Sequence, residues 1–235
     1  MIRNIFANHG ITITEEQEQK LNQYYDLLID WNNKINLTSI VEYEEVIWKH
    51  FLDSAFFVSC DKVDLKEKKK VLDLGTGAGF PGMVLAILCP DYEFVLADSL
   101  NKRIEFLKVV INRLQIHNVL VIHGRAEELG RDENFRNQFD YVVSRAVAEL
   151  PVLLEYCIPF VKKGGYFVSY KSRRLDEEIE NADNALNMLY TKYEKKYKYE
   201  LEYDHSERYL VFFRCENITD SKYPRKPKKI KTNPL

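Results

Sequence analysis

The sequence predicts an α/β protein with a mostly parallel β-sheet. From residue 70 onward, short apolar segments alternate with patterns typical of amphipathic helices, which indicates a series of β-α-β units. Four of the nine glycines lie between residues 75 and 82, directly after the first apolar segment. Only four polar residues separate the last two strand-like segments, too few for a parallel crossover, so we expect the sheet to end in an antiparallel hairpin.

Residues 1–65 predict a helical cap that precedes this sheet. Thr14 and Gln17 have the spacing of a capping box at a helix start. The apolar side chains that follow recur at spacings of three and four, as one face of a helix requires; they are Leu21, Tyr24, Leu28, Trp31 and Ile35. A second helix is expected over residues 42–58, and the charged segment 61–70 predicts an exposed connector.

The elements of the sheet follow in order along the chain. Five parallel strands are expected over residues 71–74, 94–97, 119–122, 141–144 and 166–170, and the closing hairpin over residues 198–203 and 208–215. Helices are expected over residues 83–88, 102–114 and 176–194. Gly164 and Gly165 predict a turn that opens the fifth strand.

The composition is that of a globular protein, with 34 basic and 36 acidic residues among 235. We expect one structural unit with three parts: the cap at 1–65, an α/β core at 66–217 and a basic tail at 218–235. No apolar run approaches the ~20 residues that span a membrane, and the start lacks a signal-peptide core, so no membrane partner is expected. Four scattered cysteines predict reduced thiols and a cytoplasmic protein; they are Cys60, Cys89, Cys157 and Cys215.

The glycine loop is the strongest indication of function. Gly75, Gly77 and Gly79 form a G-x-G-x-G turn directly after the first apolar segment. A P-loop is excluded, because Phe80 and Pro81 stand where its Lys and Ser/Thr would follow. Three interpretations remain: a site for S-adenosylmethionine, a dinucleotide site, or a purely structural turn.

Several details favour S-adenosylmethionine. Asp73 lies just before the loop, where a carboxylate would repel a pyrophosphate but suits the ammonium of a methionine group. Phe80 and Pro81 provide apolar cover rather than the amides that a diphosphate needs. No hydride-transfer residue is evident. Gly82 nevertheless keeps the dinucleotide interpretation open, because it places a glycine three residues after Gly79.

Residues at the ends of the later strands suit the same donor. Asp98 ends the second strand, where its carboxylate can accept hydrogen bonds from both ribose hydroxyls or, alternatively, cap the next helix. Ala126 and Glu127 follow the third strand and are positioned for an adenine or, alternatively, for a solvated cap. Arg145 ends the fourth strand, where a side chain points into the crevice at the sheet edge, which favours a role in the site.

Seven short motifs also occur in a fixed order. They are Asn36-Leu37-Thr38, Lys49-His50-Phe51-Leu52-Asp53-Ser54, LDLGTGAGFPG at 72–82, Asp98-Ser99-Leu100 with Lys102-Arg103, GRAEEL at 124–129, SRAVA at 144–148 and the ending Tyr223-Pro224-Arg225 with Pro234-Leu235. Together they resemble the bacterial RsmG family, from about residue 30 to the C-terminus. The glycine loop alone would be a weak signal, whereas the ordered set is specific.

The resemblance implies a class I, Rossmann-like methyltransferase. It implies methyl transfer from S-adenosylmethionine to N7 of a guanine in small-subunit (16S) ribosomal RNA, with the RNA or the subunit particle as partner. By position, Gly75 and Phe80 are implied to bind the donor, Ala126 and Glu127 to contact its adenosine, and Arg145 to be a further site residue. No metal is expected, and nothing requires more than a monomer.

The acceptor implied by the family removes the need for a general base. Guanine N7 carries a free lone pair, so no proton has to leave before attack. Catalysis is then mainly alignment, and Arg145 is expected to align the substrate through guanine O6 or a phosphate. In agreement, the sequence has neither an Asn/Asp-Pro-Pro-aromatic motif for exocyclic amines nor a Pro-Cys nucleophile for pyrimidine C5.

The expected RNA contacts are cationic. Residues 222–235 contain six basic and no acidic side chains, and three prolines predict that this tail is extended. The residues expected to contact RNA are Arg173, Arg174, Lys222, Arg225, Lys226, Lys228, Lys229 and Lys231. The sequence leaves the roles of Lys49 and His50 open.

Two other functions remain compatible with the sequence. A methyltransferase of the same fold with a small-molecule or protein acceptor would not need the basic tail for activity. A non-enzymatic RNA-binding module with a vestigial pocket would have no affinity for the donor.

Overall fold

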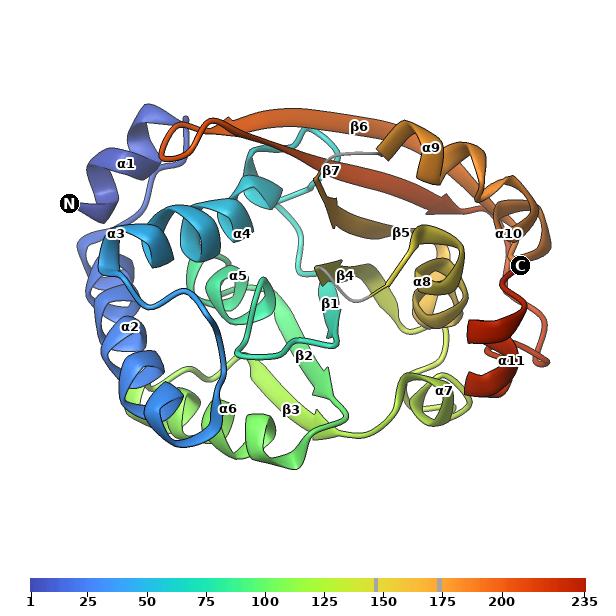
Figure 1. Cartoon of the computed structure of the whole chain (residues 1–235), viewed down its shortest axis with the longest axis horizontal. Coiled ribbons are helices and arrows are strands. Elements are labelled where there is room, and N and C mark those ends of the chain that lie inside the picture. Colours follow the sequence, from blue (N-terminus) through green and yellow to red (C-terminus); the bar gives the residue numbers. More distant parts are fainter. Residues whose placement is uncertain (146–147, 173–174) are drawn as a thin grey trace.

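A computed structural model of the chain describes residues 1–145, 148–172 and 175–235. Helices cover both faces of a seven-stranded sheet with the strand order β3-β2-β1-β4-β5-β7-β6 (Figure 1). Strands β1 to β5 run parallel, whereas β7 pairs antiparallel with both β5 and β6. The predicted α/β class with a closing antiparallel hairpin is confirmed.

The strands are β1 (Lys70–Leu74), β2 (Glu93–Asp98), β3 (Val119–His123), β4 (Phe139–Arg145), β5 (Val161–Lys171), β6 (Thr191–Leu201) and β7 (Ser206–Cys215). The α-helices are α1 (Ile2–Asn8), α2 (Glu15–Ile35), α3 (Tyr43–Val46), α4 (Asp53–Ala55), α5 (Gly82–Leu88), α6 (Asn101–Leu114), α7 (Ala126–Leu129), α8 (Leu150–Cys157), α9 (Leu175–Glu180), α10 (Asp183–Met188) and α11 (Pro227–Thr232). A π-helix, η1 (Ile47–Leu52), and two 3-10 helices, η2 (Phe56–Ser59) and η3 (Ile158–Phe160), complete the described elements.

The two faces of the sheet pack against different helices (Figure 1). On β1, Val71 belongs to the core formed with the N-terminal helices, α5 and α6, whereas Leu72 belongs to the core formed with α8, α9 and α10. Val143 and Val142 repeat this alternation on β4, as the two-residue period of a strand requires. Because both faces are covered, the central strands are mostly apolar, and the buried polar side chains Asp73 and Ser144 lie near their carboxyl ends.

The N-terminal cap is attached to the glycine loop. Thr14 and Gln17 form the predicted capping box at the start of α2. The Gln17 amide also donates to the carbonyls of Ile87 and Leu88 at the end of α5. Deeper in the structure, the buried Tyr24 hydroxyl donates to a carbonyl oxygen of the loop. The cap therefore shares one core with the sheet.

Three expectations about the elements were wrong. The expected helix at 42–58 is divided into α3, η1, α4 and η2. The expected helix at 176–194 is divided into α9 and α10 and ends at Met188; Tyr190 then adopts a left-handed φ of 52°, and β6 begins at Thr191 instead of the expected 198. Gly165 lies inside β5 rather than in a turn; a Cβ there would lie 2.7 Å from the Asp140 carbonyl, so the close approach of β4 requires glycine.

The C-terminal segment also differs from the extended tail that its prolines predicted. Residues Pro227–Thr232 form helix α11, with Pro227 at the first turn, where its ring is compatible with a helix. This helix packs against α8. Helix α8 was not predicted at all.

The structure also addresses two expectations from composition. All four cysteines are buried and free of disulfides, as expected. Among residues 1–145, 148–172 and 175–235, no helix is both long enough and apolar enough to cross a membrane.

The strand order reverses between β1 and β4, which are neighbours at the centre of the sheet. At such a switch point, the connections from the two strands leave toward opposite faces and open a crevice at the carboxyl ends. The glycine loop follows β1, and Arg145 ends β4. The fold therefore brings both to this crevice.

Two glycines of the loop provide a matched test of its packing. Gly79 has a φ of 100°, and a Cβ there would overlap the Tyr24 hydroxyl and lie 2.9 Å from Leu107. Gly77 has a φ of 61°, but a Cβ there would meet nothing within 4 Å. Gly79→Ala should lower the free energy of unfolding by about 3 kcal/mol or more, and Gly77→Ala by about 1 kcal/mol, in urea titrations without ligand. Equal losses would contradict this packing.

Candidate active site

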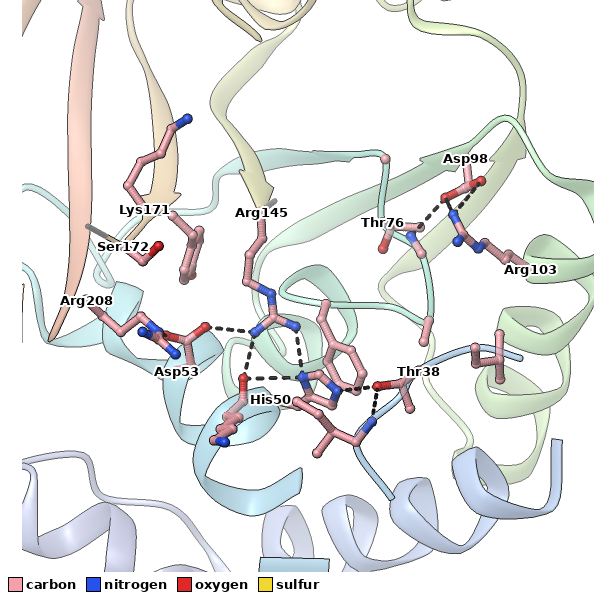
Figure 2. Close-up of a pocket in the computed structure, with 18 of the residues that line it drawn as sticks. Thr38, His50, Asp53, Thr76, Asp98, Arg103, Arg145, Lys171, Ser172 and Arg208 are labelled. Carbon is pink, nitrogen blue, oxygen red and sulfur yellow. Dashed lines mark hydrogen bonds and ion pairs between the residues drawn. The ribbon is translucent and has the colours of Figure 1, made fainter. Parts of the chain in front are cut away.

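A cleft of about 720 Å³ opens at the switch point. It lies between the cap, which contributes Thr38 and His50, and the sheet, which contributes Arg145 (Figure 2). A second hollow of about 430 Å³ adjoins it, and the two share Gly75, Asp98 and Ser99 in their walls. The arrangement is one continuous site with two compartments.

The glycine loop forms the junction of the two compartments. Gly75 and Gly77 have φ values of 75° and 61°, which residues with a side chain rarely adopt. The amides of Gly75 and Thr76 donate to the Ala97 carbonyl, and the Gly77 amide donates to Asp98 Oδ2 at 2.9 Å. Because these amides are used within the protein, the loop offers no cradle for a diphosphate.

Asp73 lies beneath the loop and lines neither compartment. Its Oδ2 accepts hydrogen bonds from the Thr76 hydroxyl at 2.7 Å and the Gly82 amide at 2.8 Å. Burial raises the pKa of Asp73 to about 6, and Oδ1 has no partner among the described residues. These contacts shape the loop, so the predicted contact of Asp73 with an ammonium group remains a prediction. Gly79 likewise packs against the cap and does not line the cleft.

Asp98 is the acidic group at the junction. Its side chain is only 2% exposed and forms an ion pair with Arg103, whose Nη1 lies 3.1 Å from Oδ2. Its Oδ1 accepts the Leu100 amide at 2.9 Å, at the start of α6. Both predicted roles are thus compatible with the structure, since Asp98 supports the helix start and also lines both compartments.

Arg145 connects the sheet to the cap. Its side chain leaves the end of β4 and points toward η1 (Figure 2). The guanidinium donates to Asp53 Oδ2 at 2.8 Å, to the Lys49 carbonyl at 3.1 Å and to His50 Nδ1 at 3.3 Å. Its Cζ also lies 5.3 Å from the ring centroid of Phe80. These contacts fix the orientation of the cation at the cleft wall.

His50, whose role the sequence left open, is a neutral structural partner of this arginine. Its ring stacks on Phe80 with a centroid distance of 4.4 Å. Burial, together with the charge of Arg145, lowers the pKa of His50 to about 3. His50 Nδ1 lies 3.3 Å from Arg145 Nη2 and 3.2 Å from the Lys49 carbonyl, and Nε2 lies 2.9 Å from the Thr38 hydroxyl. With both nitrogens engaged, His50 is not positioned as a general base.

Asp53 and Arg208 are site residues that the sequence analysis did not single out. Asp53 is 3% exposed, and besides Arg145 it accepts a hydrogen bond from the Tyr199 hydroxyl at 2.8 Å. Arg208 Nε lies 3.9 Å from Asp53 Oδ1 (Figure 2). Lys49, also left open, lines the cleft and pairs with Glu45 on the cap helix and with Asp204 on the hairpin. In the sequence, the family motif at 49–54 contains Lys49 and Asp53, whereas no motif included Arg208.

The second compartment is lined by Ala126, Glu127 and Tyr156 of α8, and the predicted contact of Ala126 and Glu127 with adenosine remains a prediction. Its wall also includes Lys231 and Pro234 of the C-terminal segment. The sequence analysis assigned Lys231 to RNA contact and gave Pro234 no role. An acidic side chain and an aromatic ring suit a nucleoside better than a phosphate group.

The residues predicted to contact RNA have different environments. Arg173 and Arg174 lie outside the described residues. Arg225 is largely buried against Glu155, with Nη2 2.6 Å from Oε2. Lys222 pairs with Asp220, and the exposed cations that remain are Lys226, Lys228, Lys229 and Lys231. Among the described residues, no group of His, Cys, Asp and Glu side chains is arranged to hold a metal ion.

Comparison with known families and proteins shows which family this chain belongs to. Residues 17–205 match the family model described as rRNA small subunit methyltransferase G. The chain belongs to this family. A relative from Lachnoclostridium phytofermentans, named ribosomal RNA small subunit methyltransferase G, is 50% identical over 216 residues, covering 92% of this chain and 88% of its own. A relative of the same name from Clostridium novyi is 43% identical over 235 residues, covering 100% and 96%.

Solved structures support the fold of this family member. A fibrillarin pre-rRNA processing protein of Methanococcus jannaschii superposes with a TM-score of 0.54 at 19% identity, covering 70% of this chain and 74% of its own. A SAM-dependent methyltransferase from Aquifex aeolicus gives 0.53 at 18% identity, covering 73% and 93%. The resemblance seen in the sequence motifs is therefore confirmed at the level of family and fold.

The environment of His50 predicts a dependence of stability on pH. Between pH 6.5 and about 3, the unfolded chain binds a proton on this imidazole that the folded protein does not bind. Folding stability is therefore lost as the pH falls through this window, by about 1.4 kcal/mol per unit from this group. His50→Gln should reduce the difference in unfolding free energy between pH 7 and pH 5 by about 1–2 kcal/mol in urea titrations. An unchanged difference would contradict a buried neutral imidazole.

Proposed function

We propose that this protein transfers a methyl group from S-adenosylmethionine to N7 of a guanine in bacterial 16S ribosomal RNA. Membership of the rRNA small subunit methyltransferase G family is the observation that carries the proposal. The two-compartment site gives it a physical basis, since one compartment suits a nucleoside and the other is lined by a fixed arginine.

The proposed donor site spans the junction. Ala126 and Glu127 would contact the adenine, and Asp98 would accept hydrogen bonds from the ribose hydroxyls. The methionine end would lie along Gly75 and Phe80, in the larger compartment. The open space at the position of a Gly77 Cβ supports this placement, because a ligand can approach the loop backbone there.

The guanine would enter the larger compartment beside Arg145. When bound, the donor supplies a methyl group already activated by the sulfonium charge. The protein's task is to align N7 with that methyl group, and a guanidinium held by three acceptors is suited to hydrogen-bond a guanine edge or a phosphate. Asp53 balances the charge of Arg145, so the pair adds no net charge beside a base that becomes cationic on N7 methylation.

Basic side chains at the rim are suited to guide RNA into this compartment. Lys49, Lys171 and Arg208 line the larger compartment. Each of these three faces a carboxylate within the protein, so the exposed lysines on and beside α11 would supply further positive charge for RNA. Arg173 and Arg174 follow Lys171 in the sequence and are proposed to contribute in the same way.

The decisive experiment is a nucleoside analysis by mass spectrometry. Small subunits and naked 16S RNA from cells lacking this enzyme are incubated with the purified protein, S-adenosylmethionine and excess EDTA. We expect about one new 7-methylguanosine per RNA molecule. A methyl group on another atom would overturn the N7 assignment, and absence of methylation by a protein that binds the donor would overturn the RNA acceptor.

The role of Arg145 can be separated from donor binding. Arg145→Lys cannot reach the Asp53, Lys49 and His50 acceptors together, so we expect kcat/KM for RNA to fall about 10²-fold. Arg113→Lys, on the exposed surface of α6, is the matched control and should behave like the parent protein. Methylation kinetics at saturating donor measure the effect, and an unchanged kcat/KM in Arg145→Lys would exclude the alignment role.

A further inference from the structure

The C-terminal segment, residues 222–235, lies beside the smaller compartment of the site. Lys231 and Pro234 form part of the same wall as Ala126 and Glu127. In Figure 1, helix α11 and the C-terminus lie next to α7 and α8, on the side of the sheet away from the cap. A segment expected to serve only RNA binding therefore contributes to a pocket.

This segment is held in place by buried interactions. Glu155 of α8 is fully buried. Its carboxylate accepts hydrogen bonds from Nε and Nη2 of Arg225, and also from the Arg225 backbone amide at 2.8 Å. Arg136 donates to the carbonyls of Thr219, Asp220 and Tyr223 at 2.7–3.0 Å. Because an unpaired buried carboxylate is costly, the Arg225–Glu155 pair strongly favours the docked position.

Apolar contacts complete the attachment. The Tyr223 and Ile230 side chains are 2% and 0% exposed. Pro224 packs so closely on Gly130 that a Cβ there would lie 3.0 Å from Pro224 Cδ. On the short helix α11, burial of Ile230 leaves Lys228 and Lys229 exposed to solvent. Lys231 is exposed as well, but of the three lysines on this helix it is the one that lines the smaller compartment.

We propose that the C-terminal segment forms one wall of the adenosine half of the donor site, and that Lys231 and Pro234 contribute to donor affinity. The inference rests on the donor placement proposed above. Pro234 provides apolar cover for a purine ring, and the Lys231 ammonium has donors that suit the ring nitrogens, which are acceptors. Lys228 and Lys229 remain available for RNA, so one helix serves both ligands.

A binding titration without RNA tests the wall directly. S-adenosylhomocysteine is titrated into the full chain by calorimetry, and the double variant Lys231→Ala/Pro234→Gly should bind it about 5- to 20-fold more weakly. The matched control is Lys228→Ala/Lys229→Ala, which removes two cations from the same helix and should bind within about 2-fold of the parent. Equal donor affinity in the parent and the Lys231/Pro234 variant would overturn the inference.

Limited proteolysis of the unaltered protein provides an independent test that no folding defect can confound. Trypsin cleaves after Lys228, Lys229 and Lys231, and saturating S-adenosylhomocysteine should slow these cleavages at least 5-fold. Cleavage in the connector at Lys66 and Lys68, far along the chain from this segment, should be unaffected. Absence of donor-dependent protection would overturn the inference.

These outcomes separate the two proposals. If the parent protein binds no donor, the proposed function fails. If the parent and both double variants bind the donor with equal affinity, and the donor does not protect α11 from trypsin, only the role of the C-terminal segment fails.

Discussion

The site depends on one charge pair, between the largely buried Arg145 and the buried Asp53. Removing two charges from water costs several kcal/mol per ion, and their attraction compensates only if the remaining hydrogen-bonding capacity is also satisfied. Here it is satisfied by the Tyr199 hydroxyl on Asp53 and by the Lys49 carbonyl and His50 on Arg145. The cap, the end of β4 and the closing hairpin must therefore meet at one point. The apolar core that the N-terminal helices share with the sheet holds these three parts together.

The same charge pair is central to the chemistry that we propose for the site. A guanidinium with all of its neighbours fixed is a preorganised donor, so no reorganisation is needed when the acceptor base arrives. The neutral His50 completes this arrangement through packing and hydrogen bonding rather than proton transfer. An acceptor atom with a free lone pair fits such a site, because alignment is the only task left to the protein.

Local features of the molecule could be predicted from the sequence. The capping box at Thr14, the glycine loop and the apolar strands each depend on neighbouring residues, and short-range rules describe them well. The closing hairpin was predicted because a four-residue connection excludes other topologies. The family motifs further marked Arg145 and the residues near 126 as parts of the site. The strand order, which the sequence analysis did not predict, places Arg145 at the switch point and the residues near 126 after the edge strand β3.

Other features depend on contacts between distant residues and could not be predicted in this way. Tyr199 meets Asp53 across 146 positions of sequence, and Arg225 meets Glu155 across 70. No local pattern indicates either pairing. Helix α8 was missed because nearly all of its residues are apolar. With Glu155 as its one charged side chain, it shows no evident amphipathic stripe. The prolines of the C-terminal segment were misleading, since Pro227 begins a helix as readily as it maintains an extended chain.

The position of the chain ends has a practical consequence for work with this protein. Met1 is exposed beside α1, at the opposite end of the molecule from the C-terminus (Figure 1). Leu235 is half-buried and follows directly on Pro234, in the wall of the smaller compartment. An affinity tag or fluorescent fusion attached after Leu235 would therefore begin next to the wall of that compartment. Fusions at the N-terminus leave this region unchanged, which makes that end the better choice for purification and imaging.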